Sequence, residues 1–414
     1  MGEPDEFSGK QVTVMGLGRF GGGVGVTRFL ADRGADVLVT DLDDADKLNK
    51  SIEQIQDLID SGRVTLRLGE HNVSDFTTCD LVVVNPAVKP GNRFIRAAEA
   101  AGIEVTTEMR LLVQRLPNRL RTIGITGSAG KSTVTAMIGH VLRKVPGIKA
   151  WVGGNIGVSL LPEIAQIGDD DWVVLELSSF MLERLKAGDH FPGWSPHIAL
   201  VTNINPNHLD WHGSMEEYVA SKQVLLDYQH PGEGDCDAAM MGPGTHLMLQ
   251  TNVSDLGEWI DDDMEDFIKP ENWELVVPGK HNRVNAELAS CVISLIDDRI
   301  NCETDCHDAL ADFPGLPHRL QLVAEHNGAR YFNDSKCTTP EAAILAIQAF
   351  TEDGDTVGIH LILGGKDKGS DMKPLAVLAA EQCRAVYTIG ALGDTIAGLI
   401  DTADEAASAE LARP

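Results

Sequence analysis

The chain has 414 residues, 43% of them hydrophobic, which is enough for about three domains with buried cores. Its formal net charge of −28 opposes binding to nucleic acid or to an anionic membrane surface, because both are negatively charged as well. The seven cysteines lack the paired spacing of a zinc site or a disulfide framework, and we find neither a signal peptide nor a membrane-spanning apolar run, so we expect a cytoplasmic protein without membrane insertion.

A strand followed by a glycine turn opens the first domain. The apolar run 11–18 leads into Gly16, Gly18 and Gly21, and Asp41 follows about twenty residues later. This is the fingerprint of a dinucleotide-binding βαβ unit. The turn alone leaves three interpretations open, namely a phosphate-binding turn, a nicotinamide site and a structural turn. We expect further strands at 35–41, 80–84 and 103–106.

A second glycine loop is the strongest functional signal in the sequence. The apolar strand 121–125 runs into Gly127, Ser128, Ala129, Gly130, Lys131, Ser132 and Thr133, and a helical stretch follows to Lys144. Glycines let backbone N–H groups surround phosphate oxygens, the helix start favours anions, and lysine adds a mobile cation. The loop fits the short form Gly-x-x-Gly-Lys-Ser, since Ile125 stands where the longer motif has glycine.

Two polar residues lie at or shortly after the ends of strands downstream of this loop. Glu176 ends the strand 171–176, where a Mg²⁺ ligand is expected after a phosphate loop, although a strand-end carboxylate can also cap a turn. His208 follows the strand 198–204, and we expect it to contact a metal ion or a phosphate. Lys222 lies on the helix 215–228, where the simplest interpretation is a solvated lysine.

The remainder of the chain predicts a third α/β region. Asn282 and Asn285 share one face at the start of a helix, suited to capping or to reading an adenine edge. Asn327-Gly328 predicts a hairpin, and elements at 340–350, 357–363 and 385–389 complete the pattern. Residues 229–278 give no pattern from which strands can be placed. The fold class is therefore α/β with three domains: a Rossmann-like domain at 1–107, a central ATP-binding domain with a parallel sheet at 108–315, and a Rossmann-like α/β domain at 316–414.

Seven short strings, in this order and spacing, resemble the Mur ligases of peptidoglycan synthesis, and most closely the branch that adds D-glutamate. They lie at 127–133, 153–157, 176–180, 207–210, 279–282, 316–319 and 333–336. The resemblance covers nearly the whole chain. It implies an enzyme that uses ATP and two Mg²⁺ ions to join D-glutamate to UDP-N-acetylmuramoyl-L-alanine through an acyl phosphate. We expect the enzyme to be a monomer.

The same resemblance implies roles for individual residues. Lys131, His208 and Lys222 would be catalytic, with Lys222 carbamylated by CO₂. Ser132, Glu176, His208 and the carbamylated Lys222 would hold metal. ATP would be bound by residues 127–133 together with Asn282, Asn285, Arg319 and Asp334. The UDP-substrate would be bound by Gly16, Leu17, Gly18, Arg19, Phe20, Asp41, Leu42, Asn85, Asn155 and Ser178. D-Glutamate would be bound by Lys336, Thr338 and Lys368.

Three departures from the family pattern bear on these roles. Asn207 stands where the family commonly has aspartate, and Cys337-Thr338-Thr339 replaces the usual Ala-Thr-Asn. A Leu-Ser-Pro-containing stretch that contacts D-glutamate in relatives is not found before Pro414, so we expect either a fragment or a different hold on glutamate. The alternative to an active ligase is thus a catalytically impaired nucleotide-binding protein. A nicotinamide-dependent oxidoreductase would have no use for Lys131.

Overall fold

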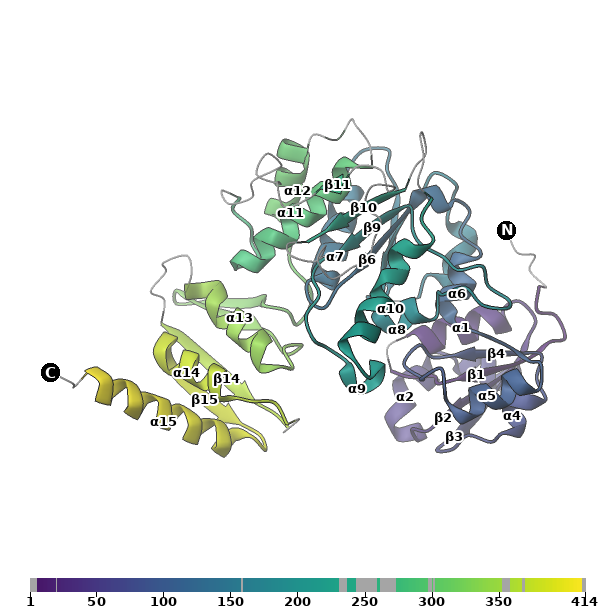
Figure 1. Ribbon diagram of the computed structural model, residues 1–414, viewed down its shortest axis with the longest axis horizontal. Helices are drawn as coiled ribbons and strands as arrows, with labels where there is room; N and C mark the ends of the chain where they lie inside the picture. The colour runs from purple at the N-terminus through teal and green to yellow at the C-terminus, as the bar shows by residue number, and fades with distance from the viewer. Residues whose placement is uncertain are drawn as a thin grey trace. The chain divides into compact units, whose positions relative to one another are not determined.

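The described strands form two large parallel sheets and two smaller two-stranded sheets, with helices packed against them (Figure 1). The computed structural model describes residues 6–19, 21–157, 159–230, 237–242, 259–260, 273–296, 300, 302–351, 358–366 and 369–411. Phe20 and Lys368, both predicted site residues, lie outside this set. The chain divides into one unit of residues 1–268 and 288–305 and a second of residues 269–287 and 306–414.

The first sheet has the parallel order β3-β2-β1-β4-β5, which confirms the Rossmann-like prediction. Its strands are β1 (Gln11–Met15), β2 (Asp36–Asp41), β3 (Val64–Leu68), β4 (Leu81–Val84) and β5 (Glu104–Thr106). Its helices are α1 (Gly22–Ala31), α2 (Ala45–Glu53), α3 (Gln56–Asp60), α4 (Ser74–Thr77), α5 (Arg93–Ala100) and α6 (Glu108–Val113). β1 and β4 are interior strands and almost wholly buried, in agreement with their largely apolar sequences. The sequence reasoning missed β3.

The second sheet is parallel throughout, in the order β11-β10-β9-β6-β8-β7, as predicted for the central region. Its strands are β6 (Thr122–Thr126), β7 (Ala150–Gly154), β8 (Trp172–Glu176), β9 (Ile198–Val201), β10 (Ala238–Met241) and β11 (Trp259–Ile260). The associated helices are η1 (Arg119–Arg121), α7 (Lys131–Lys144), η2 (Leu161–Gln166), α8 (Ser179–Glu183), α9 (Leu209–His212) and α10 (Met215–Asp227). β6 lies between β8 and β9, so the loops that follow these three strands meet at one edge.

The N-terminal and central sheets belong to the same unit and are joined by close packing. A Cβ atom at Gly25 on α1 would stand 2.4 Å from the Cβ of Ser159, which precedes η2. Ser159 donates from its hydroxyl to Oε1 of Glu108, 2.5 Å away, at the start of α6. Glu108 is buried, and this burial raises its pKa to about 7. The contact between the two sheets therefore contains a carboxyl group that titrates near neutral pH.

The remaining elements include both smaller sheets. They are α11 (Lys280–Ser294), the π-helical turn η6 (Cys302–Cys306), α12 (His307–Ala311), β12 (Gln321–His326), β13 (Ala329–Asn333), α13 (Pro340–Thr351), β14 (Ile359–Gly364), α14 (Lys373–Gln382), β15 (Cys383–Ile389) and α15 (Gly393–Leu411). β12 and β13 form the predicted hairpin, with Asn327 and Gly328 both in the left-handed region at its turn. β14 and β15 pair in parallel, and Ile347 of α13 and Leu375 of α14 are buried in the core beside them.

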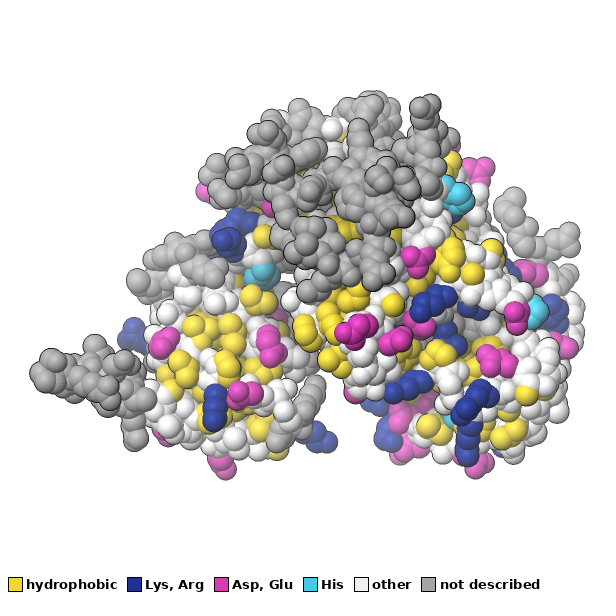
Figure 2. Space-filling view, in the orientation of Figure 1, with side chains coloured by type: hydrophobic (Ala, Val, Ile, Leu, Met, Phe, Trp, Pro, Cys, Tyr) yellow, Lys and Arg dark blue, Asp and Glu magenta, His cyan; other side chains and the backbone are white. Residues whose placement is uncertain are grey.

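The surface carries charges of both signs. Acidic and basic side chains are interspersed on the face shown in Figure 2, so on this face the excess of acids does not form a single patch. Among the described residues, no helix combines the length and the apolar character needed to cross a membrane.

Replacing Glu108 with glutamine should change how stability depends on pH. The carboxyl pKa is about 7 in the folded chain and 4.5 in its unperturbed state, so the folded state holds more protons between these values. The stability that protonated Glu108 contributes is present below about pH 4.5 and is lost as the pH rises through 7. This contribution to the free energy of unfolding is at most roughly 3 kcal/mol. Urea unfolding from about pH 5 to about pH 8 should show the unsubstituted chain losing stability relative to Glu108→Gln.

The matched control is Glu104→Gln, which changes an exposed glutamate on β5 and should follow the unsubstituted chain. Parallel curves for Glu108→Gln and the unsubstituted chain would show that Glu108 is already ionised in the folded state.

Candidate functional site

The loop between β6 and α7 has a shape that only glycine permits at two positions. Gly127 has φ +144° and Gly130 has φ +82°, both in the left-handed region. A Cβ atom at Gly127 would lie 2.0 Å from Oγ1 of Thr202, which follows β9. The Thr202 hydroxyl donates to the carbonyl of Ala129 at 2.6 Å, and Asn203 accepts from the Ala129 amide at 2.9 Å. Residues after β9 thus hold the loop in place.

The predicted phosphate-binding cation lies against this loop. Lys131 is the first residue of α7, and its Nζ donates to the carbonyls of Gly127 at 2.8 Å and Ser128 at 3.1 Å. Ser132 and Thr133 follow in the first turn of the same 14-residue helix. A glycine loop with a lysine at a helix start can bind phosphate oxygens through backbone N–H groups, the helix dipole and the ammonium group.

Lys222 is buried, so the simplest interpretation of this residue, a solvated lysine, is wrong. Its side chain is 1% exposed, and Nζ donates to the carbonyl of Gly127 at 2.8 Å. Nζ also lies 4.5 Å from the ring centre of Tyr218, one turn earlier on α10. Burial, with a smaller contribution from the charge of Lys131, lowers the Lys222 pKa to about 6. Most Lys222 side chains are therefore neutral amines at neutral pH, and a neutral amine is a nucleophile.

Glu176 at the end of β8 has one oxygen that lacks a protein partner. The residue is 1% exposed, and its Oε1 accepts a hydrogen bond from Nδ2 of Asn155 at 2.8 Å. Its Oε2 is buried and has no hydrogen-bond partner among the described residues. Such an orphaned carboxylate oxygen fits a divalent cation, and Mg²⁺ is commonly held by one or two carboxylates together with substrate phosphates. In the described part of the chain no three His, Cys, Asp or Glu side chains form a metal cluster.

His208 lies at the start of α9 within a group of aromatic rings. It adopts a left-handed conformation with φ +54°, and its ring centre lies 4.8 Å from that of Phe180. Burial and the charge of Lys131 lower the His208 pKa, while Asp210 raises it to a smaller extent. The lowered pKa favours the neutral imidazole, the form that can bind a metal ion.

The glycine turn after β1 is organised by Asp41. Its Oδ2 accepts from the Gly18 amide at 3.0 Å and its Oδ1 from the Asp43 amide at 2.9 Å. Leu17 is fully buried, so its side chain packs in the core rather than facing a ligand. Arg19 pairs with Asp43 at 2.9 Å. Both Asp41 oxygens are thus already bonded to backbone amides, one in the glycine turn and one in the segment after β2.

A cavity of about 700 Å³ lies beside this turn. Of the predicted residues, Leu42 reaches it and is 67% exposed, while Asn85 packs against Gly16. The sequence reasoning missed other residues of its lining, including His71, Lys89, Phe94 and Trp211. The run Val88-Lys-Pro-Gly91 after β4 was an available signal, since loops at the carboxyl ends of parallel strands commonly bind ligands. Two residues of the central region were also predicted to bind the UDP-substrate. Asn155 is hydrogen-bonded to Glu176, and Ser178 caps α8.

In the second unit, the predicted ATP-binding residues differ in exposure. Asn282 and Asn285 are buried; Asn282 donates to the Pro278 carbonyl at 2.7 Å, and Asn285 donates to Asn282 at 3.3 Å. Asp334 accepts from the Leu320 amide at 3.0 Å, and burial raises its pKa. Three predicted residues of this unit are exposed, namely Arg319, Lys336 and Thr338.

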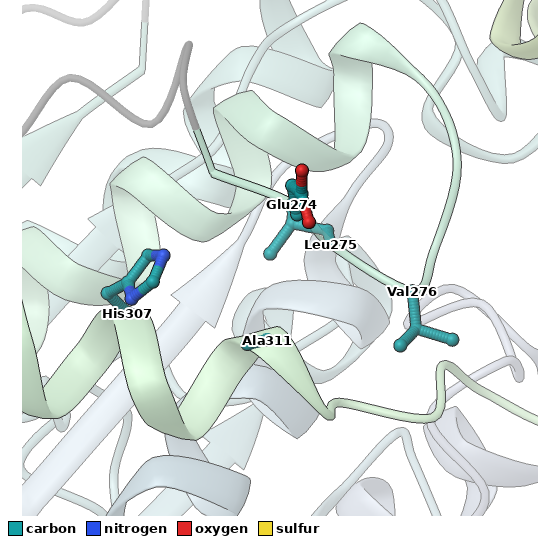
Figure 3. Close-up of a pocket in the computed structure, with 5 residues that line it drawn as sticks. All are labelled: Glu274, Leu275, Val276, His307 and Ala311. Atoms are coloured by element: carbon teal, nitrogen blue, oxygen red, sulfur yellow. The ribbon is translucent and has the colours of Figure 1, made fainter.

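A second cavity, of about 600 Å³, also belongs to this unit. It lies between the extended segment 274–276 and α12, and its lining includes His307 and Ala311 (Figure 3). None of its lining residues was predicted to be functional.

Three segments of the chain match known family models. Residues 10–107 match the Mur ligase MurD-like N-terminal domain, residues 125–237 the Mur ligase middle domain, and residues 318–412 the Mur ligase glutamate ligase domain. The N-terminal model matches first along the chain, the middle-domain model second and the glutamate ligase model last.

Comparison with curated proteins and solved structures agrees with these matches. A UDP-N-acetylmuramoylalanine--D-glutamate ligase from Roseiflexus sp. (strain RS-1) is 35% identical over 93% of this chain and 84% of that protein. The protein of the same name from Acidobacterium capsulatum is 35% identical over 96% of this chain and 86% of that protein. The crystal structure of a UDP-N-acetylmuramate-alanine ligase from Thermotoga maritima has a TM-score of 0.57 at 20% identity and covers 95% of this chain and 88% of that chain, which supports the fold alone.

Replacing Gly127 with alanine should disrupt the phosphate loop. The new Cβ would meet Thr202 Oγ1, so the loop must move in addition to bearing a strained φ. We expect affinity for a non-hydrolysable ATP analogue, measured by calorimetry, to fall about tenfold or more, equivalent to about 1.4 kcal/mol.

Gly147→Ala is the matched control, because Gly147 also has positive φ, +83°, but a Cβ atom at this position would have no neighbouring atom within 4 Å. It should bind the analogue as the unsubstituted chain does. Equal affinities for the two variants would contradict a role for the Gly127 shape in nucleotide binding.

Proposed function

Because the chain belongs to the Mur ligase family, we propose that it uses ATP to join the amino group of D-glutamate to the carboxylate of UDP-N-acetylmuramoyl-L-alanine. The observation that carries this proposal is the 35% identity, over nearly the whole chain, to proteins named for that reaction. This is a step in the synthesis of peptidoglycan precursors. ATP is the cosubstrate and Mg²⁺ the cofactor expected of a ligase of this family.

The chemistry has two steps that each crowd negative charge. A substrate carboxylate oxygen attacks the γ-phosphorus, the bond to ADP breaks, and an acyl phosphate forms. The D-glutamate nitrogen then attacks the acyl carbon, the carbon–oxygen bond to phosphate breaks, and the nitrogen loses a proton as the amide forms. Lys131 and the backbone of the loop 127–133 orient the triphosphate and offset its charge, because they already converge at the start of α7.

Glu176 and Ser132 are proposed to hold one Mg²⁺, which would neutralise charge on the phosphates. The unsatisfied Oε2 of Glu176 supports this assignment, and Asn155 fixes the other oxygen of the carboxylate. A second ion is proposed at His208 and a carbamylated Lys222. Asn207, in place of the usual aspartate, supplies no charge there.

Carbamylation of Lys222 is supported by its burial and by its low pKa of about 6. The neutral amine adds to CO₂, a nitrogen–carbon bond forms, and one proton leaves to water, which converts the side chain into an anion. A carboxylate-like group is then available where a lysine cation would repel Mg²⁺.

The remaining assignments stay predictions. They comprise the binding of the nucleotide sugar near the turn 16–19, the D-glutamate contacts of Lys336, Thr338 and Lys368, the three domain borders, the cytoplasmic location and the monomeric state.

Phosphate release by the 414-residue chain tests the proposed reaction. With Mg-ATP and UDP-N-acetylmuramoyl-L-alanine, we expect release that requires D-glutamate and is not supported by L-glutamate. Nucleotide binding without such release would contradict the proposal for this chain.

Lys222→Ala tests the carbamate. We expect turnover to fall about 100-fold or more, since a charge-stabilising group is removed, while UDP-substrate binding changes little. A short carboxylic acid such as acetate should restore part of the activity, because it can replace the carbamate oxygens in the space left by the side chain.

The control for this experiment is Lys149→Ala, which removes a lysine paired with Asp171 on the surface and should neither lose activity nor respond to acetate. Full activity in Lys222→Ala would rule out the carbamate role.

A further inference from the structure

The cavity beside the first glycine turn is completed by one residue from the central sheet's loops. Its described lining residues belong to the segment 15–94, with Trp211 of α9 as the exception. Trp211 is hydrogen-bonded to the part of the wall formed by the segment 87–89, which follows β4. A ligand in this cavity therefore touches both the N-terminal sheet's loops and α9.

Three hydrogen bonds tie this segment to the central domain. The indole Nε1 of Trp211 donates to the carbonyl of Ala87 at 2.8 Å. Lys89 donates from Nζ to the carbonyl of Asp210 at 2.8 Å, so a second bond runs in the opposite direction. Arg184, just after α8, donates to the carbonyl of Val88 at 2.8 Å. Three consecutive residues of the cavity wall are thus bonded to α9 and to the end of α8.

Trp211 also connects to His208 by two routes. Along α9, the backbone N–H of Trp211 donates to the carbonyl of His208 at 3.0 Å. Through side chains, the ring centres of Trp211 and His208 each lie 4.8 Å from the ring centre of Phe180. Trp211 and His208 therefore share Phe180 as a common ring contact, so the position of the indole bears on the ring against which His208 rests.

The aromatic group continues from α9 to the phosphate loop. His212 lies 5.3 Å from the ring of Tyr218, and the hydroxyl of Tyr218 is 2.8 Å from that of Ser128. The same tyrosine ring faces Nζ of Lys222 at 4.5 Å. One continuous set of contacts thus runs from the cavity wall to the loop where ATP is expected.

We propose that Trp211 is a positioning residue that links occupation of the cavity to the placement of His208, an inference that rests on the proposed ligase function. The nucleotide part of the UDP-substrate fills the cavity and orders the segment 87–89. The indole N–H then holds α9, and with it His208, in the arrangement used for phosphoryl transfer. Binding energy from a part of the substrate far from the reacting carboxylate is in this way used for orientation.

Trp211→Phe is the decisive variant, because it keeps an aromatic ring against Phe180 but removes the indole donor. With the full UDP-substrate, kcat should fall about tenfold or more, while KM for that substrate should change by less than about threefold. Trp151→Phe is the matched control: it also loses an indole hydrogen bond, from Nε1 to Asp171 at 2.8 Å, and should keep the kcat of the unsubstituted chain.

Shortening the substrate provides a second readout that a purely structural role would not change. Phospho-N-acetylmuramoyl-L-alanine lacks the uridine monophosphate portion and leaves the cavity empty. In the unsubstituted chain and in Trp151→Phe, kcat should be about tenfold or more lower with the short substrate. In Trp211→Phe, the two substrates should give kcat values within about threefold of each other.

Each outcome decides the matter. An unchanged kcat in Trp211→Phe with the full substrate overturns the proposal. The proposal is also overturned if the kcat values for the full and the short substrate differ as much in that variant as in the unsubstituted chain. Absence of D-glutamate-dependent phosphate release in the unsubstituted chain overturns the proposed function, and this inference falls with it. D-Glutamate-dependent phosphate release in the unsubstituted chain, together with an unchanged kcat in Trp211→Phe, overturns this inference alone.

Discussion

The hydrogen bond from Lys222 to the carbonyl of Gly127 is the interaction on which the arrangement of the site depends. Burying an amine is costly unless its hydrogen bonds are satisfied or it gives up its proton, and Lys222 does both. The bond requires Gly127 to turn its carbonyl toward α10, which needs the left-handed φ that glycine permits. Lys131 donates to the same carbonyl, so one backbone oxygen orders two lysines around the phosphate loop.

The positions of the strands and glycine turns were predictable because they depend on local pattern. Apolar runs such as 121–125 become strands buried on both faces, and Glu176 ends β8 as its position in such a run predicted. The state of Lys222 was not predictable from the residues around it in sequence. Its burial depends on the phosphate loop, about a hundred residues earlier, and on packing that no local pattern encodes. Trp211 was missed for the same reason, since its partner Ala87 lies on a different sheet's loop.

The first glycine turn shows how a motif can be structurally correct and chemically ambiguous. The spacing of Gly16, Gly18 and Asp41 predicted a βαβ unit, which is present. In a nicotinamide site the acidic residue would be available to bond ribose hydroxyls. Here both oxygens of Asp41 accept from backbone amides of the turn and of the segment after β2. The carboxylate thus shapes the turn, and the family matches, rather than the motif, identify the chain as a ligase.

The close contact between Gly25 and Ser159 helps to set the spacing of the two sheets in the unit that carries both the cavity and the phosphate loop. A Cβ atom at Gly25 would stand 2.4 Å from the Cβ of Ser159, so a larger residue there would push α1 and the segment before η2 apart. Such a change would alter the distance between the cavity and the phosphate loop without touching either one. A ligand that must reach both places would then fit less well, although every residue that contacts it is unchanged.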